Sequence, residues 1–255
     1  MIRWIIPLLG AALWFVTSQT GIVPAYLLPH PFRVAEAGWS YISGASGAGP
    51  YAGRFAGDLA ASFARVGAGF ALAAALGLPI GILSGRVRMA RELVGGTINA
   101  LRAVPGISWL PLAMVWLGIG TKTTVFLVAL AAFFPIYLNA AAGARHVDPL
   151  LLQAGAMMGA GKLRSAFDIL LPAAMPHIVT GLRLGLGISW AYLVLGELSG
   201  VPDGLGAVIM DARMSGDIEM IVVGVIVIAV VGKTSDALLK LALRACFRSA
   251  RRMPR

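Results

Sequence analysis

Residues 148–172 read DPLLLQAGAMMGAGKLRSAFDILLP, an amphipathic and partly basic segment between long apolar runs. Asp148 followed by Pro149 predicts the start of a helix, because the carboxylate can accept from free backbone N–H groups and proline has no N–H to leave unpaired. Apolar side chains then recur at i, i+4, i+7 and i+8 on one face, at Leu150, Ala154, Met157 and Met158. Gly159 and Gly161 are expected to loosen or end this helix.

The composition places this segment in a membrane protein. Apolar side chains make up 58% of the 255 residues and charged ones 13%, whereas charged residues alone form about a quarter of an ordinary soluble domain. The net charge of +10 does not indicate nucleic-acid binding, because the basic residues cluster in short segments between apolar runs. The attraction of basic residues to anionic membrane lipid explains these basic clusters better. We therefore expect an all-α, polytopic membrane protein in which residues 1–255 form a single transmembrane domain.

Six runs are expected to span the membrane, since about 20 helical residues cross about 30 Å of hydrocarbon. They are residues 3–30, 66–85, 103–121, 123–144, 178–200 and 220–241. The first run resembles a signal peptide, but no small-x-small cleavage site stands out after it, so an uncleaved span is preferred to a cleaved signal. Lys233 and Asp236 interrupt the last run, where they could pair at i, i+3 or lie at the interface.

The distribution of Lys and Arg predicts the orientation. These residues fall on alternate loops that share one predicted side, at Arg3, residues 86–91, Arg145, residues 162–164 and residues 240–255. By the positive-inside rule that side is cytoplasmic. The opposite side carries Arg33, Arg54, Lys122 and an acidic loop over residues 203–219. Both termini are therefore expected in the cytoplasm, and residues 148–172 should form a cytoplasmic helix between spans four and five.

The same segment carries a motif of fixed spacing, formed by Gln153, Ala154, Gly155, Gly159, Ile169, Leu171 and Pro172. It resembles the cytoplasmic loop of the permease subunits of bacterial ABC importers, whose signature is Glu-Ala-Ala, three residues, Gly, nine residues, Ile-x-Leu-Pro. Gln153 stands where that family has glutamate, which removes a charge that could face an ATPase. Gly155 stands where it has alanine, at a cost of about 1 kcal/mol in helix propensity.

Further motifs are similar to the sulfonate, nitrate and taurine branch of these permeases. They read LRAVP (101–105), WLP (109–111), WLGIG (116–120), FFPIYLN (133–139) and GLRLGLG (181–187). The resemblance covers a core of residues 59–244. It implies a permease located in the inner (cytoplasmic) membrane that pairs with a second copy, a separate ABC ATPase and an external solute-binding protein, with residues 148–172 as the ATPase-coupling segment.

Motifs for catalysis, metals and cofactors do not fit the sequence. Residues 232–234 (GKT) match the last three positions of a phosphate-binding loop, but Val227 occupies the position of its first glycine, and the stretch is an apolar span. The single cysteine, Cys246, rules out an internal disulfide, and the three histidines lack metal-ligand spacing. We expect no catalytic residue, no metal and no cofactor in this chain, and ATP hydrolysis by another polypeptide.

Three charged residues are candidates for the solute pathway, namely Arg102, Arg183 and Glu197. The arginines could attract an anionic solute, or could extend to water from the interface. Glu197 could relay protons, although a packed, hydrogen-bonded residue near the outer interface is the preferred interpretation. The expected function is ATP-driven import of a small anionic solute such as a sulfonate, taurine or nitrate. The alternative is a stand-alone secondary transporter or channel that uses Glu197 as a proton site.

Overall fold

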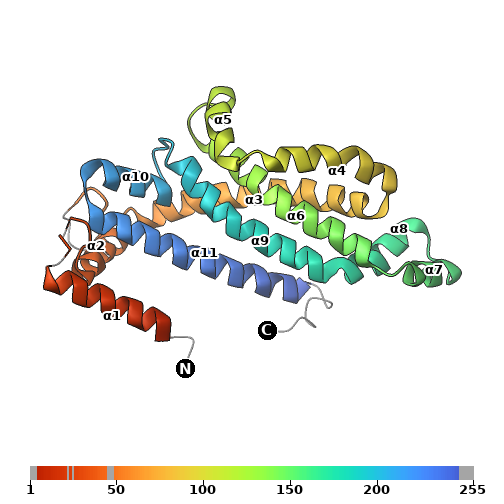
Figure 1. Ribbon diagram of the computed structural model, residues 1–255, viewed down its shortest axis with the longest axis horizontal. Helices are drawn as coiled ribbons and strands as arrows, with labels where there is room; N and C mark the ends of the chain where they lie inside the picture. Colours follow the sequence, from red (N-terminus) through yellow and green to blue (C-terminus); the bar gives the residue numbers. More distant parts are fainter. Residues whose placement is uncertain (1–4, 22, 25, 45–48, 247–255) are drawn as a thin grey trace. The chain divides into compact units, whose positions relative to one another are not determined.

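The structure is a computed structural model in which residues 5–21, 23–24, 26–44 and 49–246 are described. Every regular element in those ranges is a helix, which confirms the expected all-α class (Figure 1). The chain divides into two compact units. Unit 1 comprises residues 1–63 and 197–230, and unit 2 comprises residues 64–196 and 231–255.

Four helical stretches are long and apolar enough to cross a membrane, and a bent pair of helices gives up to five in the part of the chain described. The four are α3 (Phe55–Arg86), α6 (Thr121–His146), α11 (Ile218–Cys246) and the continuous run of α8 (Lys162–Ser165), η3 (Ala166–Leu170) and α9 (Leu171–Glu197). They cover the second, fourth and sixth expected spans and most of the fifth. The first expected span contains α1 (Ile5–Thr20), whose 16 residues extend about 24 Å.

The third expected span, residues 103–121, is not a single helix. Helix α4 (Arg88–Ala103) ends there, and η2 (Gly106–Ser108) with α5 (Trp109–Leu117) leaves it at a bend of 83°. The break has a local cause, because Pro105 has no N–H and disfavours a helical conformation at the preceding residue. Val104 is accordingly extended, with ψ of 121°.

Helix α6 forms the centre of unit 2, and small residues bring α3 against it. A Cβ on Gly69 would lie 2.6 Å from Val128 Cγ1, and a Cβ on Gly81 would lie 2.6 Å from the Tyr137 carbonyl oxygen. Glycine at these positions therefore lets the two helices pack closely. Gly67 differs, because a Cβ there would meet open space.

Unit 1 contains α1, α2 (Pro31–Ser43), the first turns of α3 and α11, and α10 (Leu205–Ser215). Its core includes Tyr41, Val208, Ala212 and Met220. The sequence predicted an acidic loop where α10 lies. The helix fits between two glycines that adopt positive φ, Gly204 at 116° and Gly216 at 75°.

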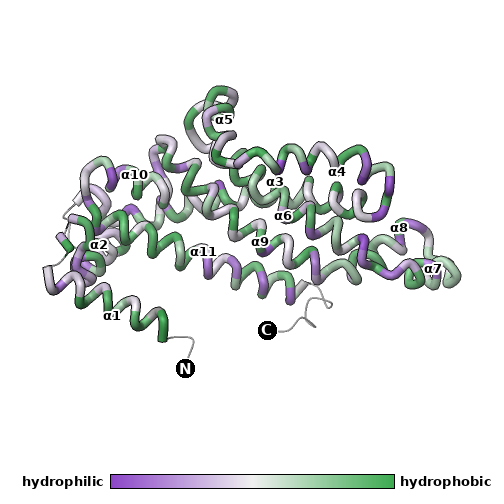
Figure 2. Tube along the Cα trace, viewed as in Figure 1, coloured by the Kyte–Doolittle hydropathy of each residue, from purple (hydrophilic) through white to green (hydrophobic). Residues whose placement is uncertain are grey.

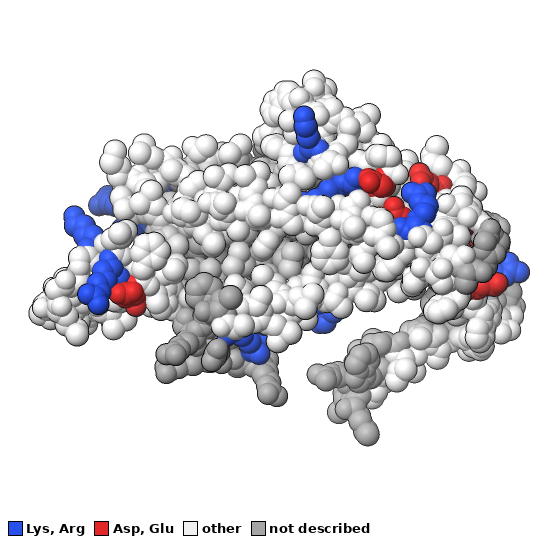
Figure 3. Space-filling model, turned by 180° about the vertical axis from the view of Figure 1, so that it is seen from behind, with Lys and Arg blue, Asp and Glu red and all other residues white. Residues whose placement is uncertain are grey.

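Many charged residues lie near the ends of the long helices, whereas Arg183, Lys233 and Asp236 lie inside them. The hydrophilic start of α4 in unit 2 lies at the same end as α7 (Pro149–Met157) and α8 (Figure 2). On the face shown in Figure 3, Lys, Arg, Asp and Glu occupy separate clusters on an otherwise uncharged surface. This pattern is typical of a surface in contact with lipid. Arg3 and residues 247–255, which were used to predict orientation, lie outside the described residues.

Candidate functional site

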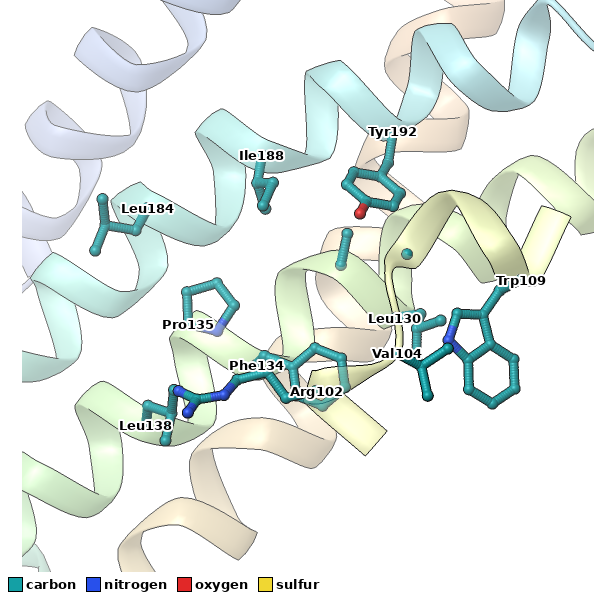
Figure 4. A pocket seen from close by; sticks show the side chains of 12 residues that line it. Arg102, Val104, Trp109, Leu130, Phe134, Pro135, Leu138, Leu184, Ile188 and Tyr192 are labelled. Atoms are coloured by element: carbon teal, nitrogen blue, oxygen red, sulfur yellow. The ribbon is translucent and has the colours of Figure 1, made fainter. Parts of the chain in front are cut away.

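A cavity of about 540 Å³ lies in unit 2 against the break between α4 and α5. The end of α4, η2 and α5 form one wall, α6 the second and α9 the third, so the break in the third expected span is what opens this space (Figure 4). Its lining is largely apolar, with Phe134 and Pro135 from α6 and Leu184 and Ile188 from α9.

Three side chains bring polar atoms to this cavity, namely Arg102, Trp109 and Tyr192. Figure 4 shows the Arg102 guanidinium beside Leu138 and the Tyr192 hydroxyl directed toward the α4–α5 break. A Cβ on Gly106 would collide with the Tyr192 ring, so glycine is needed where the broken backbone passes it. Among the described residues the Arg102 side chain has no ion pair or hydrogen bond. It is an available cation in an apolar wall.

Arg183, the second candidate cation, is paired within the chain. Its Nε donates to Asp236 Oδ1 at 2.8 Å and its second guanidinium nitrogen donates to Oδ2 at 2.7 Å. This two-point contact joins α9 to α11. The sequence left open whether Asp236 pairs with Lys233 or lies at the interface, and the structure gives Asp236 a partner on another helix, Arg183. The reason is geometric, since α9 presents a planar guanidinium whose two N–H groups match both carboxylate oxygens.

Glu197 lies in unit 1 with no solvent-exposed surface. Ser62 Oγ donates to both of its carboxylate oxygens at 2.9 and 3.0 Å, and the Gly206 backbone N–H donates to Oε2 at 2.8 Å. Ser62 also accepts from the Leu205 N–H at 2.9 Å. These contacts satisfy free N–H groups at the start of α10. Glu197 is thus packed and hydrogen-bonded, as the preferred interpretation held.

Asp58 completes the same arrangement one turn away on α3. Its Oδ1 accepts from the Gly204 N–H at 3.0 Å, and its Oδ2 accepts from the Tyr41 hydroxyl at 3.1 Å. Burial, and then the neighbouring Asp58 carboxylate, raise the pKa of the Tyr41 phenol above its ordinary value. Tyr41 therefore stays protonated and remains a donor to Asp58. Two buried carboxylates and Ser62 thus hold the beginning of α10.

The motif segment begins as the sequence predicted. Asp148 Oδ1 accepts from the Leu150 N–H at 2.9 Å, and Pro149 opens α7. The helix ends at Met157, and Gly159 adopts the left-handed region with φ of 82°. Both the helix start and its end near the glycines are confirmed. The following run contains the π-turn η3, in which the Leu171 N–H donates to the Ala166 carbonyl, immediately before Pro172.

Helix α7 turns its apolar stripe away from the rest of the chain. Gly155 is buried, and a Cβ there would collide with Ile169 Cδ1, so two positions of the motif pack against each other. Met157 and Met158 are 85% and 88% exposed, and Gln153 and Ala154 are exposed as well. The stripe that the sequence identified is therefore an unpartnered surface. The simple gain in helix stability expected from alanine at position 155 is opposed by the need to move Ile169.

Comparison with known proteins gives the family. Residues 77–246 match the family model described as "Binding-protein-dependent transport system inner membrane component". The chain belongs to this family. The match includes the cavity around Arg102 and the whole of residues 148–172.

Relatives in this family include named transport permeases. SsuC of Bacillus subtilis (strain 168), a permease protein named for the transport of aliphatic sulfonates, is 35% identical over 94% of this chain and 84% of its own length. The taurine transport system permease protein TauC of Escherichia coli (strain K12) is 32% identical over 91% of this chain and 82% of its own. This chain is accordingly a membrane-spanning permease subunit of an ABC importer.

A solved structure shares the fold. A chain of the MetNI methionine ABC transporter in inward-facing conformations matches with a TM-score of 0.59 at 20% sequence identity. The match covers 74% of this chain and 95% of that chain. At this identity the likeness concerns the fold alone, and it confirms the expected permease architecture.

Several residues of these sites escaped the sequence analysis. Tyr192 lines the cavity from the far end of α9, and Asp58 and Ser62 hold α10. The i, i+4 spacing of Asp58 and Ser62 at the start of a long apolar helix was an available signal, since it places two polar side chains on one face.

Residues 232–234, which resemble the end of a phosphate-binding loop, lie inside α11, and phosphate binding requires a loop at this position. Across the described ranges, no group of three or more His, Cys, Asp or Glu side chains is placed to hold a metal ion.

Proposed function

We propose that this permease subunit passes a small anionic solute, of the sulfonate or taurine class, along a pathway that includes the cavity around Arg102. The observation that supports the proposal is the unpaired guanidinium of Arg102 in a largely apolar wall. A cation that has no carboxylate partner in the chain attracts an anion more strongly than a neutralised pair does. The apolar walls suit the aliphatic part of such a solute, and SsuC and TauC are named for solutes of this kind.

A separate ABC ATPase supplies the energy by binding the exposed face of α7. That face carries Gln153, Ala154, Met157 and Met158, and methionine-rich surfaces adapt well to a partner's groove. The turn at Gly159 and the buried contact between Gly155 and Ile169 connect α7 to η3, which continues into α9, and α9 lines the cavity. Movement of α7 is thereby passed to the pathway.

A second copy of the permease completes the pathway, and an external binding protein delivers the solute. The end of unit 2 that carries α7 faces the cytoplasm together with both termini, in accord with the positive charge at that end. Residues 1–255 act as one permease domain with a core at residues 59–244. Glu197 has a structural role at α10, since its two oxygens already accept from Ser62 and Gly206.

Solute class is tested by uptake into proteoliposomes that contain the permease, its ATPase and its binding protein. Uptake of taurine and of a short aliphatic sulfonate should require ATP and compete with each other. Methionine, which carries a carboxylate and no sulfonate group, should compete poorly. ATP-independent uptake, or a preference for a cationic solute, would overturn the proposal.

The coupling role is tested at Gly159 with Gly161 as the matched control. Both glycines have open space around a Cβ, but Gly159 has φ of 82° and Gly161 has φ of −63°. Gly159→Val should therefore strain the turn by about 1–2 kcal/mol, whereas Gly161→Val should not. We expect Gly159→Val to weaken ATPase attachment or stimulated ATP hydrolysis while leaving binding-protein docking intact. Equal coupling in the two variants would remove the mechanical role of this turn.

A further inference from the structure

Unit 2 contains a second cavity, an apolar groove of about 460 Å³ between the last turns of α3 and the η3–α9 run. Leu78, Ile82 and Leu83 line one side, and Phe167 and Leu170 line the other. Every lining residue except Arg86 is apolar. The groove shares no residue with the cavity around Arg102, so the proposed solute pathway does not account for it.

Arg86 stands at one end of this groove with its charge available. It is the last residue of α3 and is exposed. Its neighbours are occupied, since Arg88 pairs with Glu92 at 2.7 Å and Arg91 Nε donates to the Ser84 carbonyl at 3.3 Å. Within the described part of the chain the Arg86 side chain makes no ion pair or hydrogen bond. The groove thus ends in an unpaired cation.

The dimensions of the groove match one leaflet of a membrane. From Leu78 to Arg86 the α3 wall rises about 12 Å at 1.5 Å per residue. Half of the hydrocarbon core is about 15 Å thick, so a groove that starts at the Arg86 interface ends before the midplane. The outer side of α3 is also apolar and exposed, with Leu72 at 48%, Leu76 at 50% and Leu83 at 55%. These exposed leucines indicate that this side of α3 faces lipid.

We propose that the groove binds an acyl chain of an anionic phospholipid, with the lipid phosphate on Arg86. The apolar walls accommodate the chain, and the guanidinium pairs with phosphate through two parallel N–H groups. The leaflet is the one on the α7 side of the membrane, where anionic headgroups attract basic residues. A dissolved anion would make no contact with the apolar wall, which extends about 12 Å along α3, and this is why we assign the site to a lipid.

The position of the site links it to the coupling segment. The far wall is η3, whose π-turn follows α8 directly and precedes Pro172. Pro79 lies opposite in α3, so both walls depart from regular α-helical hydrogen bonding at the groove. An acyl chain packed there stabilises this arrangement of η3 and with it the base of the coupling turn.

The test uses the full-length permease in vesicles of phosphatidylcholine that contain a small fraction of photoactivatable phosphatidylglycerol. After illumination, labelled residues are mapped by mass spectrometry. Label should appear on residues 78–86 and 166–174, and photoactivatable phosphatidylcholine should label them less. Arg86→Gln should reduce groove labelling about fivefold, the value of one basic residue near an anionic surface. Arg88→Gln is the matched control, because it removes the same charge two residues away and should leave groove labelling unchanged.

A second variant tests the groove independently of charge. Ala166→Leu places a larger side chain in the groove and should reduce labelling while Arg86 is retained. Equal labelling by the two lipids, or unchanged labelling in Arg86→Gln, would overturn the proposal. Cross-links between two permease copies at these residues would also overturn it, since the groove would then be an interface. Because the readout is lipid labelling, these results do not depend on which solute is transported.

Discussion

Glu197 and Arg102 are both charged residues in or beside apolar runs, yet they differ in burial and in the partners that the chain provides. Glu197 is fully buried and accepts hydrogen bonds from Ser62 and the Gly206 N–H. Arg102 lies on a cavity wall without a partner in the described chain. A charge whose partners lie in the chain stabilises the fold, whereas one without such a partner is available to a solute. Arg183 tests this distinction. Like Arg102, it is an arginine that the sequence suggested for the solute pathway, but like Glu197 it has its partner within the chain.

The largest effect is expected from Glu197→Gln. The amide retains one acceptor oxygen but brings N–H donors against groups that already donate, so the free energy of unfolding should fall by about 2–3 kcal/mol. Thermal unfolding in detergent measures this change. Asp211→Asn is the control, since that acid is 53% exposed and its contact with Arg54 is 3.9 Å long; it should change stability by less than ~1 kcal/mol. A fully stable Glu197→Gln protein that loses pH-dependent transport would revive the proton-relay alternative.

A somewhat smaller loss of stability is expected from Arg183→Gln. The substitution leaves the Asp236 carboxylate without its two-point partner, and a hydrogen bond to a charged group contributes about 1.5–3 kcal/mol. Asp236→Asn in the same chain should restore part of this loss, because no unpaired charge then remains. Unfolding and membrane yield are the measurements. Normal stability together with impaired anion uptake would place Arg183 with Arg102 instead.

Arg102→Gln should change transport and leave stability unaffected. Arg102 is the one charged residue among the described residues of the cavity lining, and its loss should raise the KM for an anionic solute about tenfold, equivalent to ~1.4 kcal/mol. Arg102→Lys keeps the charge but loses the planar guanidinium, so its KM should lie between those of the parent and Arg102→Gln. Uptake kinetics in proteoliposomes give the KM of the parent protein and of both variants. An unchanged KM in Arg102→Gln would return this residue to the surface-arginine interpretation.

The smallest effect is expected from Tyr192→Phe. The ring continues to pack against the backbone at Gly106, and only the hydroxyl is lost from the cavity, so KM should rise by about threefold or less. Tyr137→Phe makes a useful contrast, because that hydroxyl donates to Ser84 Oγ at 3.0 Å in a buried position. It should lower stability and leave KM unchanged. The reverse pattern in the two variants would contradict the distinction between partnered and available groups.

Local chemistry allowed much of the fold to be predicted. The Asp148–Pro149 helix start, the end of α7 near Gly159 and most of the long apolar helices follow from residues a few positions apart. The 83° bend has a local signal in Pro105, whereas the close approach of Tyr192, which belongs to another helix, to Gly106 has none. Helix α10 was missed because its acidic residues resemble those of a solvated loop.

The candidate sites could be predicted only in part, because pairing is a long-range property. Ser62 is 135 residues from Glu197 in sequence, and Arg183 is 53 residues from Asp236. The pattern of residues within one segment gives no information about partners that lie so far away in the sequence. The sequence therefore selected these charged residues as candidates but could not show which of them have a partner within the chain.

The glycine contacts between α3 and α6 also fix how these two helices can move. At Gly81 the space left for a side chain is taken by the Tyr137 carbonyl and the Ala140 Cβ, so the backbones touch directly. A rotation of α3 about its axis would turn a neighbouring residue to this face and carry a Cβ into a backbone that has no room for it. The close approach therefore restricts rotation of the two helices against each other, and we expect them to move together. Any rocking during transport should then pivot at other helix contacts.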